Sequence, residues 1–203
     1  GAKIVLKNGY IEASATKLLG ASIKFDGVTV TGTENIMMAA TLAKGTTVLT
    51  NVAKEPEIID LADMLIKMGA KIYGAGSDKI IIEGVDNLKG TEFYIPADRI
   101  EAGTYLAAAA VTKGEITVNG IDPNRLMKVI DKLKETGAKL DTTKNSITIS
   151  MKRDNPNPVD ITTAPFPEFP TDMQAQFSVI NAISDGTSNI CLLYTSDAAD
   201  ELR

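Results

Sequence analysis

The tripeptide Gly-Ala-Lys occurs three times in this chain, at equal intervals. The copies lie at residues 1–3, 69–71 and 137–139, so each begins 68 residues after the one before it. Each copy is followed by a β-like run, at residues 10–13, 79–83 and 146–150. Self-similarity at a fixed interval of this length indicates a fold built from copies of one supersecondary unit.

Between the copies the same order of elements recurs. A helix rich in small residues ends at a Lys-Gly pair and leads into a strand, over residues 39–50 and again over 107–118. A second helix follows each time. Pro56 and Pro123 suit the first turn of that helix, and Gly69 and Gly137 suit its C-terminal cap, where a positive φ is needed. Apolar residues at three-to-four spacing give the second helix one buried face. The pattern predicts an α/β fold (α+β type) made of βαβαββ repeats.

Domain organisation follows from the repeats. Two nearly whole repeats cover about residues 20–95 and 96–160, and a third begins near Pro165. Pro96 lies in the joining segment, which favours a domain boundary there. We therefore expect one domain over residues 1–96 and a second over 97–190. The repeat register also predicts that the chain starts and ends within repeats, truncated at both ends.

Composition excludes several kinds of chemistry. The chain has no His and a single Cys, so a Ser/His/Asp triad, a Cys/His dyad and a Cys/His zinc site are excluded within these 203 residues, and we expect no metal and no cofactor. The net charge of −5 and the few aromatic residues argue against nucleic acid or an anionic membrane as a partner. No apolar run is long enough to span a bilayer, and one unpaired Cys suits a reducing compartment, so we expect a cytoplasmic protein.

Two acidic segments are candidates for function, and each also has a structural interpretation. Glu55 and Glu57 flank Pro56 at the expected start of a helix, where the helix dipole stabilises carboxylates. Thr171 and Gln174 have the spacing of a capping box, which places Asp172 in the first turn of another helix. A carboxylate held there also suits a general base or a group that binds a hydroxyl. The pattern leaves both interpretations open.

Three long strings resemble one enzyme family. Residues 33–72, 95–110 and 169–177, the last reading FPTDMQAQF, are similar to the UDP-N-acetylglucosamine 1-carboxyvinyltransferases, and the resemblance covers about residues 1–190. It implies the enolpyruvyl transferase fold, an inside-out α/β barrel of βαβαββ repeats in two domains. It also implies transfer of enolpyruvyl from phosphoenolpyruvate to the 3-hydroxyl of UDP-N-acetylglucosamine, the first committed step of peptidoglycan synthesis, without a metal.

The resemblance assigns roles to individual positions. Asp172 matches the carboxylate that binds the sugar 3-hydroxyl and is proposed as the catalytic base. The loop Gly27-Val28-Thr29-Val30 matches the loop that contacts the nucleotide-sugar, although the family commonly has a basic residue where this chain has Gly27. Glu55, Asp98 and Arg99 match positions that face the substrate cleft.

Other parts of the family's machinery have no counterpart in these residues. They are the loop with the general acid, a Lys-Asn pair and the arginines that hold phosphoenolpyruvate, so we expect the 203 residues alone to be inactive and to need the remainder of the chain as a partner. The resemblance stops at Ile190, and residues 191–203 are expected to be a non-native tail. Two alternatives stay open: the related shikimate-pathway enolpyruvyl transferase, and a non-catalytic repeat module that binds a partner.

Overall fold

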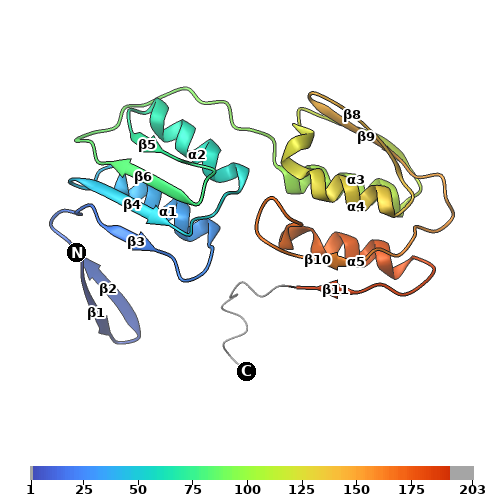
Figure 1. The fold of residues 1–203 in the computed structure, drawn as a ribbon, viewed down its shortest axis with the longest axis horizontal. Helices are drawn as coiled ribbons and strands as arrows, with labels where there is room; N and C mark the ends of the chain where they lie inside the picture. Colours follow the sequence, from blue (N-terminus) through green and yellow to red (C-terminus); the bar gives the residue numbers. More distant parts are fainter. Residues whose placement is uncertain (1, 193–203) are drawn as a thin grey trace. The chain divides into compact units, whose positions relative to one another are not determined.

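The structure is a computed structural model that describes residues 2–192. The chain divides between Tyr94 and Ile95 into two compact units (Figure 1). We name them the N-terminal lobe, residues 2–94, and the C-terminal lobe, residues 95–192. The division lies two residues before the boundary that the sequence suggested at residue 96.

The N-terminal lobe contains a complete βαβαββ repeat, preceded by a separate β-hairpin. Its elements in chain order are β1 (Lys3–Lys7), β2 (Tyr10–Ser14), β3 (Ser22–Lys24), α1 (Val30–Ala40), β4 (Thr46–Thr50), α2 (Pro56–Lys67), β5 (Lys71–Tyr73) and β6 (Lys79–Glu83). The repeat forms one sheet in the order β3-β4-β6-β5, in which β3 and β4 run parallel and the other neighbours antiparallel.

The C-terminal lobe contains a second repeat and the beginning of a third. Its elements are α3 (Arg99–Val111), β7 (Glu115–Asn119), the 3₁₀ helix η1 (Pro123–Leu126), α4 (Met127–Glu135), β8 (Lys139–Thr143), β9 (Ser146–Ser150), β10 (Ile161–Thr162), the 3₁₀ helix η2 (Thr171–Met173), α5 (Gln174–Ala182) and β11 (Ile190–Cys191). The sheet β7-β9-β8 is antiparallel, and β10 pairs with β11 in parallel. Residues 84–98 contain no strand, so the second repeat runs αβαββ and β7 lies at the edge of its sheet.

The Gly-Ala-Lys copies occupy equivalent places in the fold, which confirms the repeat. Lys3, Lys71 and Lys139 are the first residues of β1, β5 and β8, and each of these strands pairs antiparallel with the strand that follows it. Gly69 and Gly137 follow the second helix of their repeats with φ of 106° and 93°. Glycine is needed at both positions because this left-handed backbone is strained for other residues.

The helix starts agree with the sequence in one repeat and differ in the other. Pro56 is the first residue of α2, as predicted. Pro123 instead begins η1, and α4 starts only at Met127. The reason is local: Asp122 caps the 3₁₀ turn by accepting from the N–H of Asn124 at 3.0 Å, and Leu126, with φ of −140°, interrupts the helical backbone before α4.

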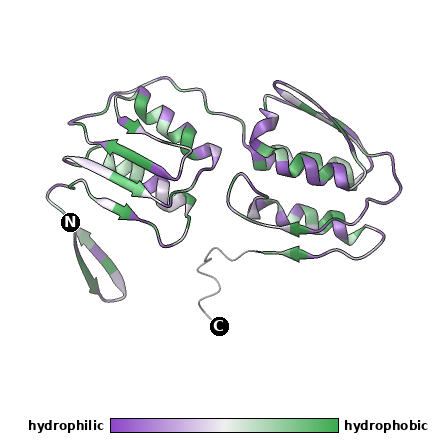
Figure 2. Cartoon of the chain, viewed as in Figure 1, coloured by the Kyte–Doolittle hydropathy of each residue, from purple (hydrophilic) through white to green (hydrophobic). Residues whose placement is uncertain are grey.

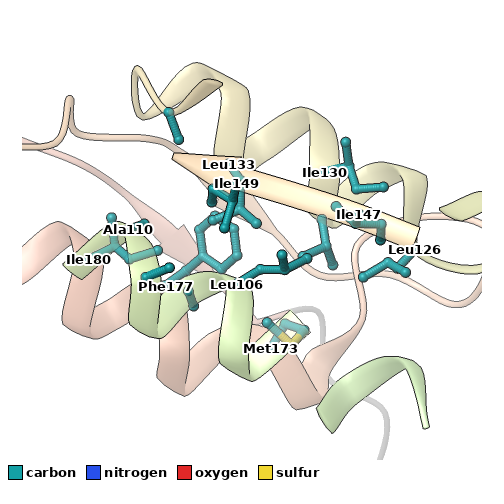
Figure 3. Packing of buried hydrophobic residues seen from close by; sticks show 14 of the residues in the cluster. Leu106, Ala110, Leu126, Ile130, Leu133, Ile147, Ile149, Met173, Phe177 and Ile180 are labelled. Carbon is teal, nitrogen blue, oxygen red and sulfur yellow. The ribbon is translucent and has the colours of Figure 1, made fainter. Parts of the chain in front are cut away.

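Each lobe has its own hydrophobic core. In the N-terminal lobe the core lies between the helices and the sheet and includes Met37, Leu49, Ile58 and Ile82. In the C-terminal lobe, buried residues of α3, α4 and β9 surround the ring of Phe177 of α5 (Figure 3). The ring of Phe177 packs edge-on against that of Phe169 with 5.0 Å between centroids. The described residues form no closed barrel, which differs from the complete fold that the resemblance implies.

The hairpin β1–β2 carries hydrophobic residues on both strands (Figure 2), and its apolar side chains are exposed. Ile4, the residue after the first Gly-Ala-Lys, is 67% exposed, whereas Ile72 at the same place in the next copy is 6% exposed. Leu6 and Ile11, which face each other across the hairpin, are also exposed. The same repeat position is therefore a core position in one copy and a surface position in another.

Candidate functional site

In the N-terminal lobe, two loops follow the carboxyl ends of the parallel strands β3 and β4. The first loop contains Gly27, Val28 and Thr29, and the second runs over residues 51–55 up to Glu55. They are joined directly, because the side-chain amide of Asn51 donates to the carbonyl of Phe25 at 2.8 Å. Loops at the carboxyl ends of parallel strands are the usual place for a binding site in α/β folds.

Thr33 fixes these loops to each other from inside α1. Its hydroxyl donates to the carbonyl oxygen of Thr29 at 2.7 Å and accepts from the N–H of Ala53 at 3.1 Å. Thr29 is the N-cap of α1, and its hydroxyl accepts from the N–H of Gly32 at 3.2 Å. Val30 is the first residue of the helix. The first-turn N–H groups of such a helix favour an anionic ligand.

Three glutamates gather beside these loops. Glu55 is only 8% exposed and stands at the N-cap position of α2, but its side chain does not cap the helix. Burial raises the pKa of the Glu34 carboxyl, and repulsion by Glu57 and then Glu55 raises that pKa further. Capping of α2 therefore does not explain why Glu55 is buried.

In the C-terminal lobe, Asp98 and Arg99 form the start of α3. Asp98 is the N-cap, and its carboxylate accepts from the N–H groups of Ile100 at 2.8 Å and Glu101 at 3.1 Å. Arg99 is 7% exposed and lines a cavity together with Phe166 and Pro170. Asp98 thus has a structural role that a sequence pattern alone can explain, whereas the burial of a charged arginine needs another reason.

Asp172 lies in the 3₁₀ turn η2 that leads into α5, and its side chain is exposed. The capping box predicted for Thr171 and Gln174 is wrong. Thr171 is the first residue of the 3₁₀ turn, and neither η2 nor α5 has a side-chain cap. The physical reason is that Pro170 occupies the N-cap position and the tight turn satisfies the N–H of Met173 with the carbonyl of Pro170 at 3.2 Å.

The structure brings Asp172 to the same end of the C-terminal lobe as Asp98 and Arg99. Met173, which is fully buried, packs against Gly103 in the second turn of α3: a Cβ atom on Gly103 would lie 2.9 Å from the Met173 sulfur. The cavity beside Arg99 is bordered by Pro170, two residues before Asp172. An exposed carboxylate and a buried guanidinium at adjoining helix starts can accept a proton and hold an anionic or hydroxyl-bearing ligand.

Neither a metal cluster nor a membrane-spanning helix is found among residues 2–192. No group of three Cys, His, Asp or Glu side chains there is arranged to hold an ion. Within the same range, no helix has the length and apolar character needed to cross a bilayer.

Comparison with known proteins identifies the family. The family model described as EPSP synthase (3-phosphoshikimate 1-carboxyvinyltransferase) matches residues 1–195. The chain belongs to the EPSP synthase family. This family match covers both lobes and the turn that carries Asp172. It also includes all of β11 and so extends beyond Ile190, where we expected the resemblance to stop. Residues 193–203 of the expected tail lie outside the described range.

Curated relatives in this family are similar over nearly the whole chain. The UDP-N-acetylglucosamine 1-carboxyvinyltransferase of Ruthia magnifica subsp. Calyptogena magnifica is 56% identical over 190 residues, which are 94% of this chain and 45% of the relative. The protein of the same name from Hydrogenovibrio crunogenus is 54% identical over 190 residues and 46% of its length. The chain thus spans about half the length of the curated relatives it matches.

Solved structures of family members agree with the fold. The enolpyruvyl transferase NikO from Streptomyces tendae matches with a TM-score of 0.81 over 99% of this chain and 51% of its own, at 20% identity. EPSP synthase from Acinetobacter baumannii matches with a TM-score of 0.60 over 94% of this chain and 45% of its own, at 19% identity. These similarities confirm the predicted enolpyruvyl transferase fold.

The candidate site residues thus form two groups: Gly27 to Val30 with Glu55 in the N-terminal lobe, and Asp98, Arg99 and Asp172 in the C-terminal lobe. The sequence did not single out three further residues that shape these groups. Glu34 joins Glu55 only because α1 and the start of α2 lie side by side, and nothing in its spacing separates it from a solvated helix residue. Thr33 and Gly103 act through contacts with distant segments, which a local pattern does not contain.

Proposed function

We propose that this chain forms about half of an enzyme that transfers the enolpyruvyl group of phosphoenolpyruvate to the 3-hydroxyl of UDP-N-acetylglucosamine, a cytoplasmic step of peptidoglycan synthesis. The observation that carries the proposal is the identity of 54–56% over 190 residues to relatives named as UDP-N-acetylglucosamine 1-carboxyvinyltransferases. The matched segment contains all the residues of both groups described above.

Each group has a proposed task. In the C-terminal lobe the carboxylate of Asp172 accepts the proton of the sugar 3-hydroxyl while that oxygen bonds to C2 of phosphoenolpyruvate and a proton adds to the methylene carbon. Phosphate then leaves as that carbon loses a proton, and the enolpyruvyl ether remains. The exposure of Asp172 and its place in the turn that leads into α5 support this task, because a substrate hydroxyl can reach an exposed carboxylate there. Asp98 and Arg99 contact the substrate from the neighbouring helix start.

In the N-terminal lobe the loop of Gly27, Val28, Thr29 and Val30 contacts the nucleotide-sugar. The helix start at Val30 supports this assignment, because free N–H groups of a first turn bind phosphate oxygens. The buried Glu55 contacts the substrate as a hydrogen-bond acceptor. The groups that hold the phosphate of phosphoenolpyruvate and protonate the methylene carbon belong to the other half of the enzyme.

The test is a chimera in which residues 2–190 replace the matching segment of the Ruthia magnifica relative. We expect it to release phosphate with UDP-N-acetylglucosamine and not with shikimate 3-phosphate, and the Asp172→Asn variant to lose a factor of about 10² to 10⁴ in kcat. The matched control is Asp122→Asn, because Asp122 also lies at a helix start in this lobe and accepts only a capping hydrogen bond among those described. It should stay within about threefold of the chimera.

Two outcomes contradict the proposal. One is a chimera with the thermal midpoint of the relative and no turnover, which favours a non-catalytic repeat module. The other is an Asp172→Asn variant within about threefold of the chimera, which leaves Asp172 as a residue of the turn only. The 203 residues alone should release no phosphate above the rate without enzyme, because they lack the cationic groups that stabilise a phosphate-bearing transition state.

A further inference from the structure

A side-chain hydrogen bond joins α3, which begins at Asp98 and Arg99, to α5, which follows the turn that carries Asp172. The Nε2 of Gln176, in the first turn of α5, donates to the hydroxyl oxygen of Thr104 at 2.8 Å, across 72 positions in the sequence. The Thr104 hydroxyl in turn donates to the carbonyl of Ile100 at 2.7 Å. Ile100 is also one of the two residues whose N–H groups bind Asp98. A continuous path therefore runs from the cap of α3 to the first turn of α5.

Gln176 lies four residues after Asp172, which places the two one helical turn apart. Met173 lies between these two residues in sequence, and its side chain packs against Gly103 of α3. The hydrogen bond of Gln176 and the packing of Met173 therefore both contribute to holding α5, and the turn that carries Asp172, on α3.

The side chain of Gln176 also has an unfavourable effect on stability, which an apolar side chain would not have. The Oε1 of Gln176 is buried, and none of the described residues donates a hydrogen bond to it. A buried acceptor without a partner destabilises a fold, and an apolar side chain of the same shape would avoid that loss. The glutamine at position 176 is therefore better explained by the hydrogen bond from its Nε2 to Thr104 of α3 than by a contribution to the stability of the fold.

We propose that Gln176 and Thr104 are positioning residues that set the Asp172 carboxylate relative to Asp98 and Arg99. The inference rests on the proposed function, because it takes Asp172 as the group that meets the sugar hydroxyl. It adds that the placement of this group is held by a neutral link between α5 and α3. Small errors in such placement are costly, since a shift of about 1 Å can lower a rate 10²-fold.

The test uses the active chimera and four single variants of it. Gln176→Leu removes both the hydrogen bond and the unpartnered oxygen, so its thermal midpoint should equal or exceed that of the chimera while kcat falls at least tenfold. Thr104→Val should lower kcat similarly, and Thr104→Ser, which keeps the hydroxyl, should restore it. KM for both substrates should stay within about twofold, because the link touches neither. The matched control is Thr112→Val, since Thr112 makes the same bond to the carbonyl four residues earlier but has no described bond to α5.

A double variant separates this inference from the proposed function. If Thr104 acts through Asp172, Thr104→Val should add less than twofold to the loss caused by Asp172→Asn. Equal kcat values for the Thr104→Val and Thr112→Val variants would overturn the inference while the Asp172→Asn result still supports the function. A loss of kcat in Gln176→Leu that is matched by a lower thermal midpoint would also overturn it. If Asp172→Asn leaves turnover unchanged, the proposed function itself fails.

Discussion

Residues in this chain differ in how well the neighbouring sequence predicts their structural role. Asp98 was assigned from the family resemblance and proves to cap α3, a local contact that its position before a helix could have predicted. Thr171 also stood before a helix with the right spacing, yet Pro170 and a 3₁₀ turn displaced the cap. Thr33, Gln176 and Thr104 act across 20 to 72 positions, so no local pattern contains their partners.

The raised pKa of Glu34 predicts that this residue affects the stability of the N-terminal lobe in a pH-dependent way. Because burial and the two neighbouring glutamates raise its pKa in the folded state, the unfolded chain ionises first as the pH rises. Glu34 therefore lowers stability above its folded pKa and has no such effect below the unfolded pKa. We expect Glu34→Gln to raise the thermal midpoint of the N-terminal lobe at pH 7 and to match the parent below about pH 4. Equal midpoints at pH 7 would contradict the raised pKa.

Gly84 is predicted to tolerate no side chain. It follows β6 and donates its N–H to the carbonyl of Gly45 at 2.9 Å, and a Cβ atom there would overlap the carbonyl oxygen of Ala43. We expect Gly84→Ala to lower the free energy of unfolding of the N-terminal lobe by about 1–3 kcal/mol or more. Gly90→Ala is the control, because nothing lies within 4 Å of its added carbon, and its effect should stay within about 0.5 kcal/mol in a urea titration.

At the level of elements, the repeat was predictable and its irregularities were not. The Gly-Ala-Lys spacing, the glycine caps and the alternating strands identify most helices and strands, because each depends on residues within a few positions. The sequence did not predict the 3₁₀ turn at Pro123 or the absence of a strand before α3. Both depend on how a segment meets its neighbours, which the repeat pattern does not specify.

The first and second hairpins should respond differently to the loss of an apolar side chain. Ile82 is fully buried in the N-terminal core, whereas Leu6 in the first hairpin is 80% exposed. We expect Ile82→Ala to lower the free energy of unfolding by about 2–5 kcal/mol. Leu6→Ala should change it by less than about 0.5 kcal/mol. Comparable losses in denaturant titrations of the two variants would mean that the first hairpin is covered in solution.

At the scale of the whole molecule, two separate hydrophobic cores replace one large one. Each core draws its buried residues from a single lobe. The repeat predicted this arrangement in outline, since a unit of about 68 residues can bury its own helices against its own strands. The residues that divide the lobes carry only the weak signal of Pro96.

Local damage should therefore remain in the lobe where it is made. Phe177→Ala removes a fully buried ring and should destabilise the C-terminal lobe by about 3–5 kcal/mol. Native-state hydrogen exchange should then become faster at amides of α3, α4 and α5 and stay within about twofold for β4 and β6. Uniformly faster exchange in both lobes would show that the two cores unfold as one.

The confinement of strand pairing to each lobe has a consequence during synthesis. Every described strand pair of the N-terminal lobe closes between residues 3 and 83, so its sheet is complete in sequence before Ile95 is added. A ribosome that adds about 5–20 residues per second needs about 5–20 s for residues 95–192 of the C-terminal lobe. Microsecond-to-second folding of such a mixed domain fits well within that time. The described strands of the N-terminal lobe can thus pair while the C-terminal lobe is still being translated.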